Sequence, residues 1–189
     1  MSRIWDHSQK HDIGTITAFR DKKDCNEGEK YTRAENQKRN KSLKAKLASL
    51  RYSVTPAKGE YIENYGSKDA TPVREEIFIV VDIEDKGNLK KDLQRLGKEF
   101  EQDSILFIPK GATGGTLIGT NDCPSGYPGL GKKVNLKNAL FGKSGAFNTR
   151  VNGRPFTLKE SEEIEYRPPD GFFGRYAAHS IAKKDWTEF

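Results

Sequence analysis

The sequence predicts an α+β fold, a ferredoxin-like split βαβ sandwich (βαββαβ) with a C-terminal β-rich, loop-rich extension. Two observations predict it: apolar and β-branched runs mark strands, and leucines three and four residues apart mark amphipathic helices. The elements follow in the order strand, helix, strand, strand, helix, strand: 13–19, 33–51, 52–56, 75–83, 88–102 and 104–108. That order is typical of two helices covering one face of an antiparallel sheet.

Local composition predicts the first elements. Residues 13–19 are small, apolar or β-branched, which suits a strand buried on both faces. The polar segment 20–31 is expected to be a mobile loop. Strand 52–56 ends at Pro56, which favours the edge of a sheet, and 58–63 continues it past a bend.

Caps and leucine spacing define the two helices. Thr32 supplies an N-cap for the first helix, and Glu35 completes a capping box. Asn88 or Asp85 caps the second. The inward stripes are Leu43, Leu47 and Leu50 in the first helix and Leu89, Leu93, Leu96 and Phe100 in the second.

The strand 75–83 is the most hydrophobic segment and is expected at the centre of the sheet. We expect one core to contain Ile79, Val81, Leu93, Leu96, Ile105 and Phe107. Beyond residue 120 helical periodicity disappears, and Asn152-Gly153 predicts a tight hairpin turn. The expected organisation is an N-terminal arm (1–12), an α+β sandwich domain (13–120) and a β-rich extension packed on it (121–189).

Composition excludes several classes of protein. The longest apolar runs, 77–81 and 105–108, are far shorter than the roughly 20 residues of a membrane span, so no membrane association is expected. The N-terminal residues show no targeting segment, which predicts a cytoplasmic protein. Cys25 and Cys123 lie far apart without metal-ligand spacing, which predicts two free thiols. No metal site, cofactor or catalytic residue is predicted.

Basic residues are concentrated in the first helix. The formal net charge is +6, and the segment between Tyr31 and Tyr52 holds seven basic residues and one acid. Such a concentration favours a polyanionic partner. The alternative is a solvated helix face.

Two sets of candidate site residues follow. The first, the predicted rim, gathers polar residues at the ends of core elements: Arg20, Glu35, Asn36, Arg39, Lys58, Tyr61, Glu75 and Glu76. These would form an anion pocket at a helix N-terminus, or else an internal salt-bridge network. The second set would contact nucleic-acid phosphates: Lys38, Lys41, Lys44, Lys46, Lys143, Arg150 and Arg154.

Several short motifs give a family resemblance over about residues 13–120. They are Ile16-Thr17-Ala18-Phe19, Glu35-Asn36 with Arg39, Gly59 with Tyr61 and Glu63, Glu75-Glu76, Leu96-Gly97-Lys98-Glu99-Phe100, Gln102-Asp103-Ser104-Ile105 and Leu117-Ile118. The sequence resembles an uncharacterised family of bacteria and tailed bacteriophages, a domain of unknown function. The resemblance implies a phage or phage-derived accessory protein and supplies no reaction.

Three interpretations of function remain open. The favoured one is an accessory protein that binds a polyanion, most plausibly nucleic acid, without base-specific readout. The second is an enzyme or sequestering protein acting on a phosphorylated small molecule or nucleotide at the predicted rim. The third is a virion or host-factor-binding protein, whose partner is a host or virion protein. For a phage-encoded chain the expected location is the host cytoplasm or the virion.

Overall fold

The computed structural model describes residues 3–25, 27–63, 71–123, 126, 128–136, 148–151 and 154–157, and the structural statements below concern these residues. The helices are α1 (Arg3–Lys10), α2 (Arg33–Ser49) and α3 (Leu89–Glu99). The strands are β1 (Ile13–Ile16), β2 (Lys22–Asp24), β3 (Glu27–Lys30), β4 (Ser53–Glu63), β5 (Thr71–Val81), β6 (Ser104–Ile108), β7 (Gly115–Gly119), β8 (Lys133–Leu136), β9 (Asn148–Val151) and β10 (Arg154–Thr157).

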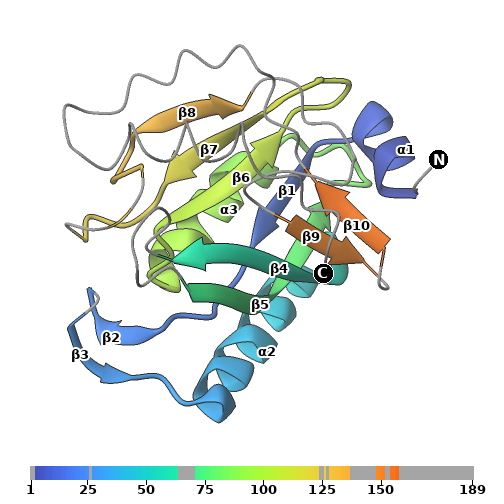
Figure 1. Cartoon of the computed structure of the whole chain (residues 1–189). Helices are drawn as coiled ribbons and strands as arrows, with labels where there is room; N and C mark the ends of the chain where they lie inside the picture. The colour runs from blue at the N-terminus through green and yellow to red at the C-terminus, as the bar shows by residue number, and fades with distance from the viewer. Residues whose placement is uncertain are drawn as a thin grey trace, which may run out of the picture.

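The main sheet has the order β10-β9-β4-β5-β1-β6-β7-β8, and its described pairings are antiparallel. Its middle part, β4-β5-β1-β6, has the strand order of the ferredoxin-like sandwich. Helix α2 packs against β4 and β5, and α3 packs against β1 and β6, on the same face (Figure 1). The predicted fold class is therefore confirmed.

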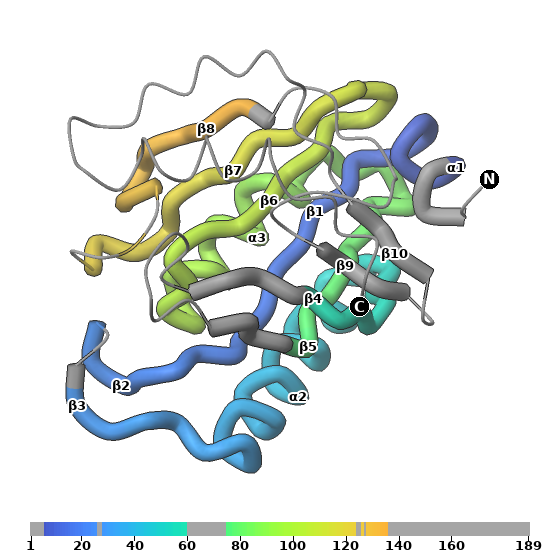
Figure 2. Tube along the Cα trace, in the orientation of Figure 1, coloured from blue at the N-terminus to red at the C-terminus, as the bar shows by residue number. Residues whose placement is uncertain are grey.

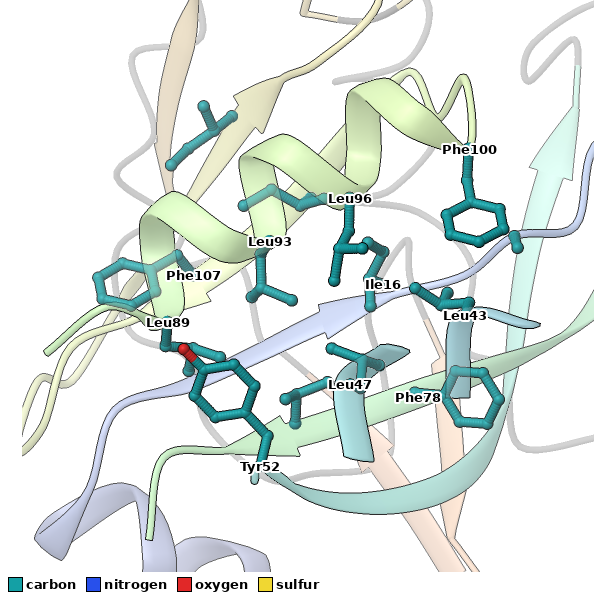
Figure 3. Close-up of a cluster of buried hydrophobic side chains, with 14 residues drawn as sticks. Ile16, Leu43, Leu47, Tyr52, Phe78, Leu89, Leu93, Leu96, Phe100 and Phe107 are labelled. Atoms are coloured by element: carbon teal, nitrogen blue, oxygen red, sulfur yellow. The ribbon is translucent and has the colours of Figure 1, made fainter. Parts of the chain in front are cut away.

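Alternation along β5 divides the apolar residues between the two faces of the sheet. Phe78 and Val80 face the helices and pack with Leu93 and Leu96, as Figure 3 shows for the labelled side chains. Ile79 and Val81 belong to a separate cluster on the opposite face. The prediction of one core was wrong on this point, because successive side chains of a strand point to opposite faces.

Helix α3 lies close against the central strand. A Cβ atom at Gly14 of β1 would stand 2.8 Å from the Leu106 carbonyl oxygen and would collide with the Leu93 side chain. Glycine at this position therefore lets the helix approach the sheet, and Leu93 is completely buried there.

The segment expected to be a mobile loop contains a small hairpin, β2–β3, which forms a two-stranded sheet of its own. The prediction of two free thiols was also wrong, because Cys25 between these strands forms a disulfide with Cys123. Their Cα atoms are 5.1 Å apart although 98 positions separate them in the chain. Spacing in sequence could not show this proximity, since it depends on where the hairpin docks.

The C-terminal part of the described chain lengthens the main sheet at both ends. Strand β8 pairs with β7 beyond β6, and the β9–β10 hairpin pairs with β4 through β9. Val151 pairs with Arg154, as expected for a hairpin around Asn152-Gly153, although these two residues lie outside the described part. Among the described residues, no helix combines the length and apolar character needed to cross a membrane.

Replacing Leu93 by alanine should lower the free energy of unfolding by about 2–5 kcal/mol, because the change leaves a cavity between α3 and β1. Urea denaturation measures this loss. Ile83 is 47% exposed, and Ile83→Ala is the control, with an expected loss of about 0.5 kcal/mol or less. Equal losses for both variants would contradict the proposed packing of α3.

Candidate functional site

Two asparagines of α2 hold the backbone that follows β1. The Asn36 side-chain amide accepts from the Arg20 N–H and donates to the Arg20 carbonyl, both at 2.9 Å. The Asn40 side chain accepts from the Ala18 N–H and donates to the Glu76 carbonyl, both at 2.8 Å. We call these two residues the asparagine clamp. It satisfies buried backbone groups that leave the sheet after Ile16.

Two arginines surround the clamp and donate mainly to main-chain carbonyls. Arg39 donates to the Ala18 carbonyl at 2.9 Å and to the Phe100 carbonyl at 2.6 Å. Arg20, which is buried, donates to the carbonyls of Lys22 and Glu101. Arg39 also lies 3.6 Å from the Glu101 carboxylate. These contacts are those of an internal network, so neither guanidinium is an open anion site.

A hollow of about 330 Å³ lies between the flank of α2 and Phe100 at the end of α3, and we call it the α2 hollow. Its walls come from the residue before the N-cap of α2, from α2 itself and from the C-cap of α3: Tyr31, Glu35, Lys38, Arg39, Ser42 and Phe100. Arg39 lies between the two aromatic walls, with its guanidinium carbon 4.6 Å from the Tyr31 ring centroid and 6.0 Å from that of Phe100. It also donates to the Tyr31 hydroxyl at 3.0 Å.

Glu35 is the carboxylate of the α2 hollow. The Thr32 N–H donates to it at 2.7 Å and the Thr32 hydroxyl at 2.8 Å, while Lys23 approaches to 3.3 Å. These contacts, led by the Thr32 N–H, lower the pKa of Glu35 to about 2. The group is therefore ionised at neutral pH. The predicted capping box is present, and the same carboxylate serves both the helix end and the hollow.

The structure brings only part of the predicted rim together. Arg20, Glu35, Asn36 and Arg39 share the network around the start of α2. The exposed residues Lys58 and Glu76 are register partners across β4 and β5.

The remaining rim residues lie elsewhere. By strand alternation Glu75 lies on the face opposite Glu76, away from α2. Tyr61 is on β4, and its side chain lies outside the described part.

Four of the predicted phosphate-binding residues lie on α2, and the other three lie in the C-terminal part of the chain. Lys38 lines the α2 hollow, Lys46 lies 2.8 Å from the Glu99 carboxylate, and Lys41 and Lys44 are exposed. Arg150 and Arg154 lie on β9 and β10 with side chains outside the described part, and Lys143 lies wholly outside it.

Sequence reasoning missed the two aromatic walls. Tyr31 directly precedes the N-cap of α2, and an aromatic residue just before a capping box could have been noticed. Phe100 was assigned to the core, and it is indeed 93% buried, but one side of it lines the α2 hollow. Nothing in the spacing of α3 indicates that second role.

The fold places the chain in the ferredoxin-like α+β class, and the α2 hollow is the candidate site in the described part. The hollow carries an ionised carboxylate, two cationic side chains and two aromatic rings. No group of three or more His, Cys, Asp or Glu residues in the described part could hold a metal ion.

Comparison with known families identifies the chain more closely. The model of the S-adenosylmethionine lyase family matches residues 14–159, so the chain belongs to that family. A comparison with curated proteins finds no match.

The family match corrects the earlier prediction of function. The predicted binding of nucleic acid as an accessory protein was wrong, because the family points to an enzyme that acts on S-adenosylmethionine. The match gives no support to a phage origin or to a domain of unknown function. One physical reason for the error is that two basic groups of the first helix already have partners: Arg39 donates to main-chain carbonyls, and Lys46 lies 2.8 Å from the Glu99 carboxylate.

Glu35→Gln should reduce stability by an amount that depends on pH. Glutamine keeps the capping hydrogen bonds but not the charge. Because the folded-state pKa is lowered, the charge stabilises the native state above the ordinary carboxyl pKa of 4.5, and this effect is lost as pH falls toward 2. Urea denaturation should show the gap between wild type and variant narrowing from about pH 5 to pH 3. A gap that stays constant would contradict this role of Glu35.

Proposed function

We propose that this chain is an enzyme that cleaves S-adenosylmethionine without using water, and that the substrate binds in the α2 hollow. Family membership supports the reaction class. The binding site is supported by one observation: Glu35, Lys38 and two aromatic rings line the same hollow. Its volume of about 330 Å³ lies within the range of small-molecule sites.

The substrate carries a sulfonium and an ammonium cation, one carboxylate and an adenine ring. An ionised Glu35 can pair with the ammonium group, and Lys38 can pair with the carboxylate. Tyr31 can contact the adenine ring, since aromatic rings stack on bases. The space between the Tyr31 and Phe100 rings already holds the Arg39 guanidinium, so it is not offered to the sulfonium cation. Arg39 positions Tyr31 through its contact with the ring and the hydroxyl.

The substrate differs in charge from the one the sequence suggested. The enzyme interpretation assumed a phosphorylated molecule held by arginines. S-adenosylmethionine has no phosphate and carries a net positive charge, so the central charge of the proposed site is the Glu35 carboxylate. This agrees with Arg20 and Arg39 donating to internal carbonyls.

The low pKa of Glu35 favours one chemical route. A carboxylate with a pKa of about 2 is a weak base, poorly suited to removing a proton from carbon. The alternative needs no base: the substrate's own carboxylate attacks its Cγ atom, a C–O bond forms and the Cγ–S bond breaks. The electron pair of that bond stays on sulfur, which leaves as neutral methylthioadenosine, and the amino acid becomes a five-membered lactone that keeps the positive charge.

In this route the protein orients the substrate. Lys38 would hold the carboxylate near the Cγ atom, and the ammonium group would be anchored by Glu35. Holding the two reacting atoms in contact removes the entropic cost of bringing them together.

Incubation of the purified chain with S-adenosylmethionine should yield methylthioadenosine, measured by chromatography and mass spectrometry. Glu35→Gln should raise KM about tenfold or more, because a charged hydrogen bond to the ammonium is lost. Glu84→Gln changes an exposed carboxylate elsewhere and is the matched control. Absence of methylthioadenosine would contradict the activity, whereas an unchanged KM in Glu35→Gln would contradict the place of binding.

The amino-acid product distinguishes the two routes. Displacement gives the lactone with both Cβ hydrogens retained, whereas elimination removes one Cβ hydrogen and gives vinylglycine. Substrate deuterated at Cβ should therefore give a product that keeps all its label. Loss of one deuterium would show that a base removes the proton, contrary to the role inferred for Glu35.

A further inference from the structure

The β2–β3 hairpin (22–30) projects beside the start of α2, apart from the main sheet (Figure 2). Its two strands carry only charged residues and glycine. Its ion pairs are formed by exposed or half-exposed side chains, with Lys23 3.2 Å from Glu29 and Lys30 3.3 Å from Asp21. A two-stranded hairpin without an apolar face is marginally stable by itself. The position of the hairpin therefore depends on the bonds and contacts that it makes with the rest of the molecule.

The Cys25–Cys123 disulfide is the covalent tie. Cys25 is exposed at the turn between the two strands, and Cys123 is 95% buried in the segment after β7. The buried sulfur has a charged neighbour, because an Arg20 guanidinium nitrogen lies 3.1 Å from Cys123 Sγ. The two cysteines thus have different surroundings, since Cys25 is an exposed residue and the Cys123 sulfur lies beside a cation.

We infer that this disulfide holds the β2–β3 hairpin in place beside the α2 hollow, and that its reduction weakens ligand binding there. We call the disulfide in this role the lock. The thiolate of an external dithiol would attack the sulfur of Cys25, the exposed residue of the pair, and the S–S bond would break with its electron pair leaving on Cys123. Arg20 would stabilise that thiolate, which makes Cys123 the better leaving group. The second thiol of the dithiol then releases Cys25, so the dithiol is oxidised by two electrons and the two cysteines are reduced.

The lock acts on the hollow because the hairpin leads directly into it. Tyr31 follows β3 and forms one aromatic wall. Lys23 of β2 lies 3.3 Å from the Glu35 carboxylate and 5.7 Å from the Tyr31 ring centroid. Reduction would free the hairpin tip and loosen both contacts. The inference rests on the proposed function for its substrate, but its effect on the hairpin does not.

The first test measures, in the full-length chain, how thiol reactivity and proteolysis of the hairpin change on reduction. Alkylation with mass spectrometry should find no reactive thiol before treatment with dithiothreitol and two afterwards. Trypsin should then cut after Lys22, Lys23 and Lys30 faster in the reduced protein, while cutting after Lys110, an exposed lysine of the main domain, stays unchanged. Free thiols in protein purified and handled without reductant, or equal cutting rates in both states, would overturn the lock.

The second test measures ligand affinity at the α2 hollow with a probe that the enzyme cannot cleave. The probe is sinefungin, an analogue with an amine-bearing carbon in place of the sulfonium. If the hairpin of the reduced protein is ordered about a tenth of the time, the dissociation constant of sinefungin rises about tenfold on reduction. Cys25→Ser should bind as weakly as the reduced wild type and should not respond to dithiothreitol. Equal affinity in both states, or no binding in either, would overturn the coupling, whereas a failure of the lyase reaction appears separately as missing methylthioadenosine.

Discussion

The hydrogen bonds of the asparagine clamp are the constraint on which this molecule is built. Strand β1 has only four residues, and the chain then leaves the sheet with its backbone groups still buried. Asn36 and Asn40 supply the partners that a neighbouring strand would otherwise provide. By doing so they also fix α2 over β5, because Asn40 bonds to the Glu76 carbonyl. Two amide side chains thus set the direction of the chain and the position of the helix that carries the α2 hollow.

The types and order of the elements could be predicted from sequence because they depend on local patterns. The capping box and the leucine stripes of both helices are present as expected. The face of the sheet that each β5 residue occupies was harder to predict, since a run of β-branched residues does not show which side chains face the helices. The disulfide could not be predicted either. It depends on the docking of a hairpin whose own strands carry no apolar signal.

The candidate site was predicted in part for the same physical reasons. Glu35 and Arg39 were found because polar residues at a helix start are conspicuous, but their partners come from distant segments. Arg39 reaches Tyr31 and Phe100, which no spacing rule connects. The basic residues of α2 led to a wrong prediction of function because a count of formal charge does not show which partners the side chains have. Arg39 donates to the Ala18 carbonyl, and Lys46 lies 2.8 Å from the Glu99 carboxylate. A count of charges therefore overstated the positive surface.

The central position of β1 has a consequence for how the chain acquires its structure. Ile13 pairs with Val81 on one side and with Ile108 on the other, so this strand has no partner close to it in sequence. Strands β4 and β5, by contrast, are near neighbours along the chain. Pairings between distant residues form late and slow folding, because the intervening chain must first be ordered. During synthesis β1 must therefore wait until residue 108 has left the ribosome before it has both of its neighbours in the sheet.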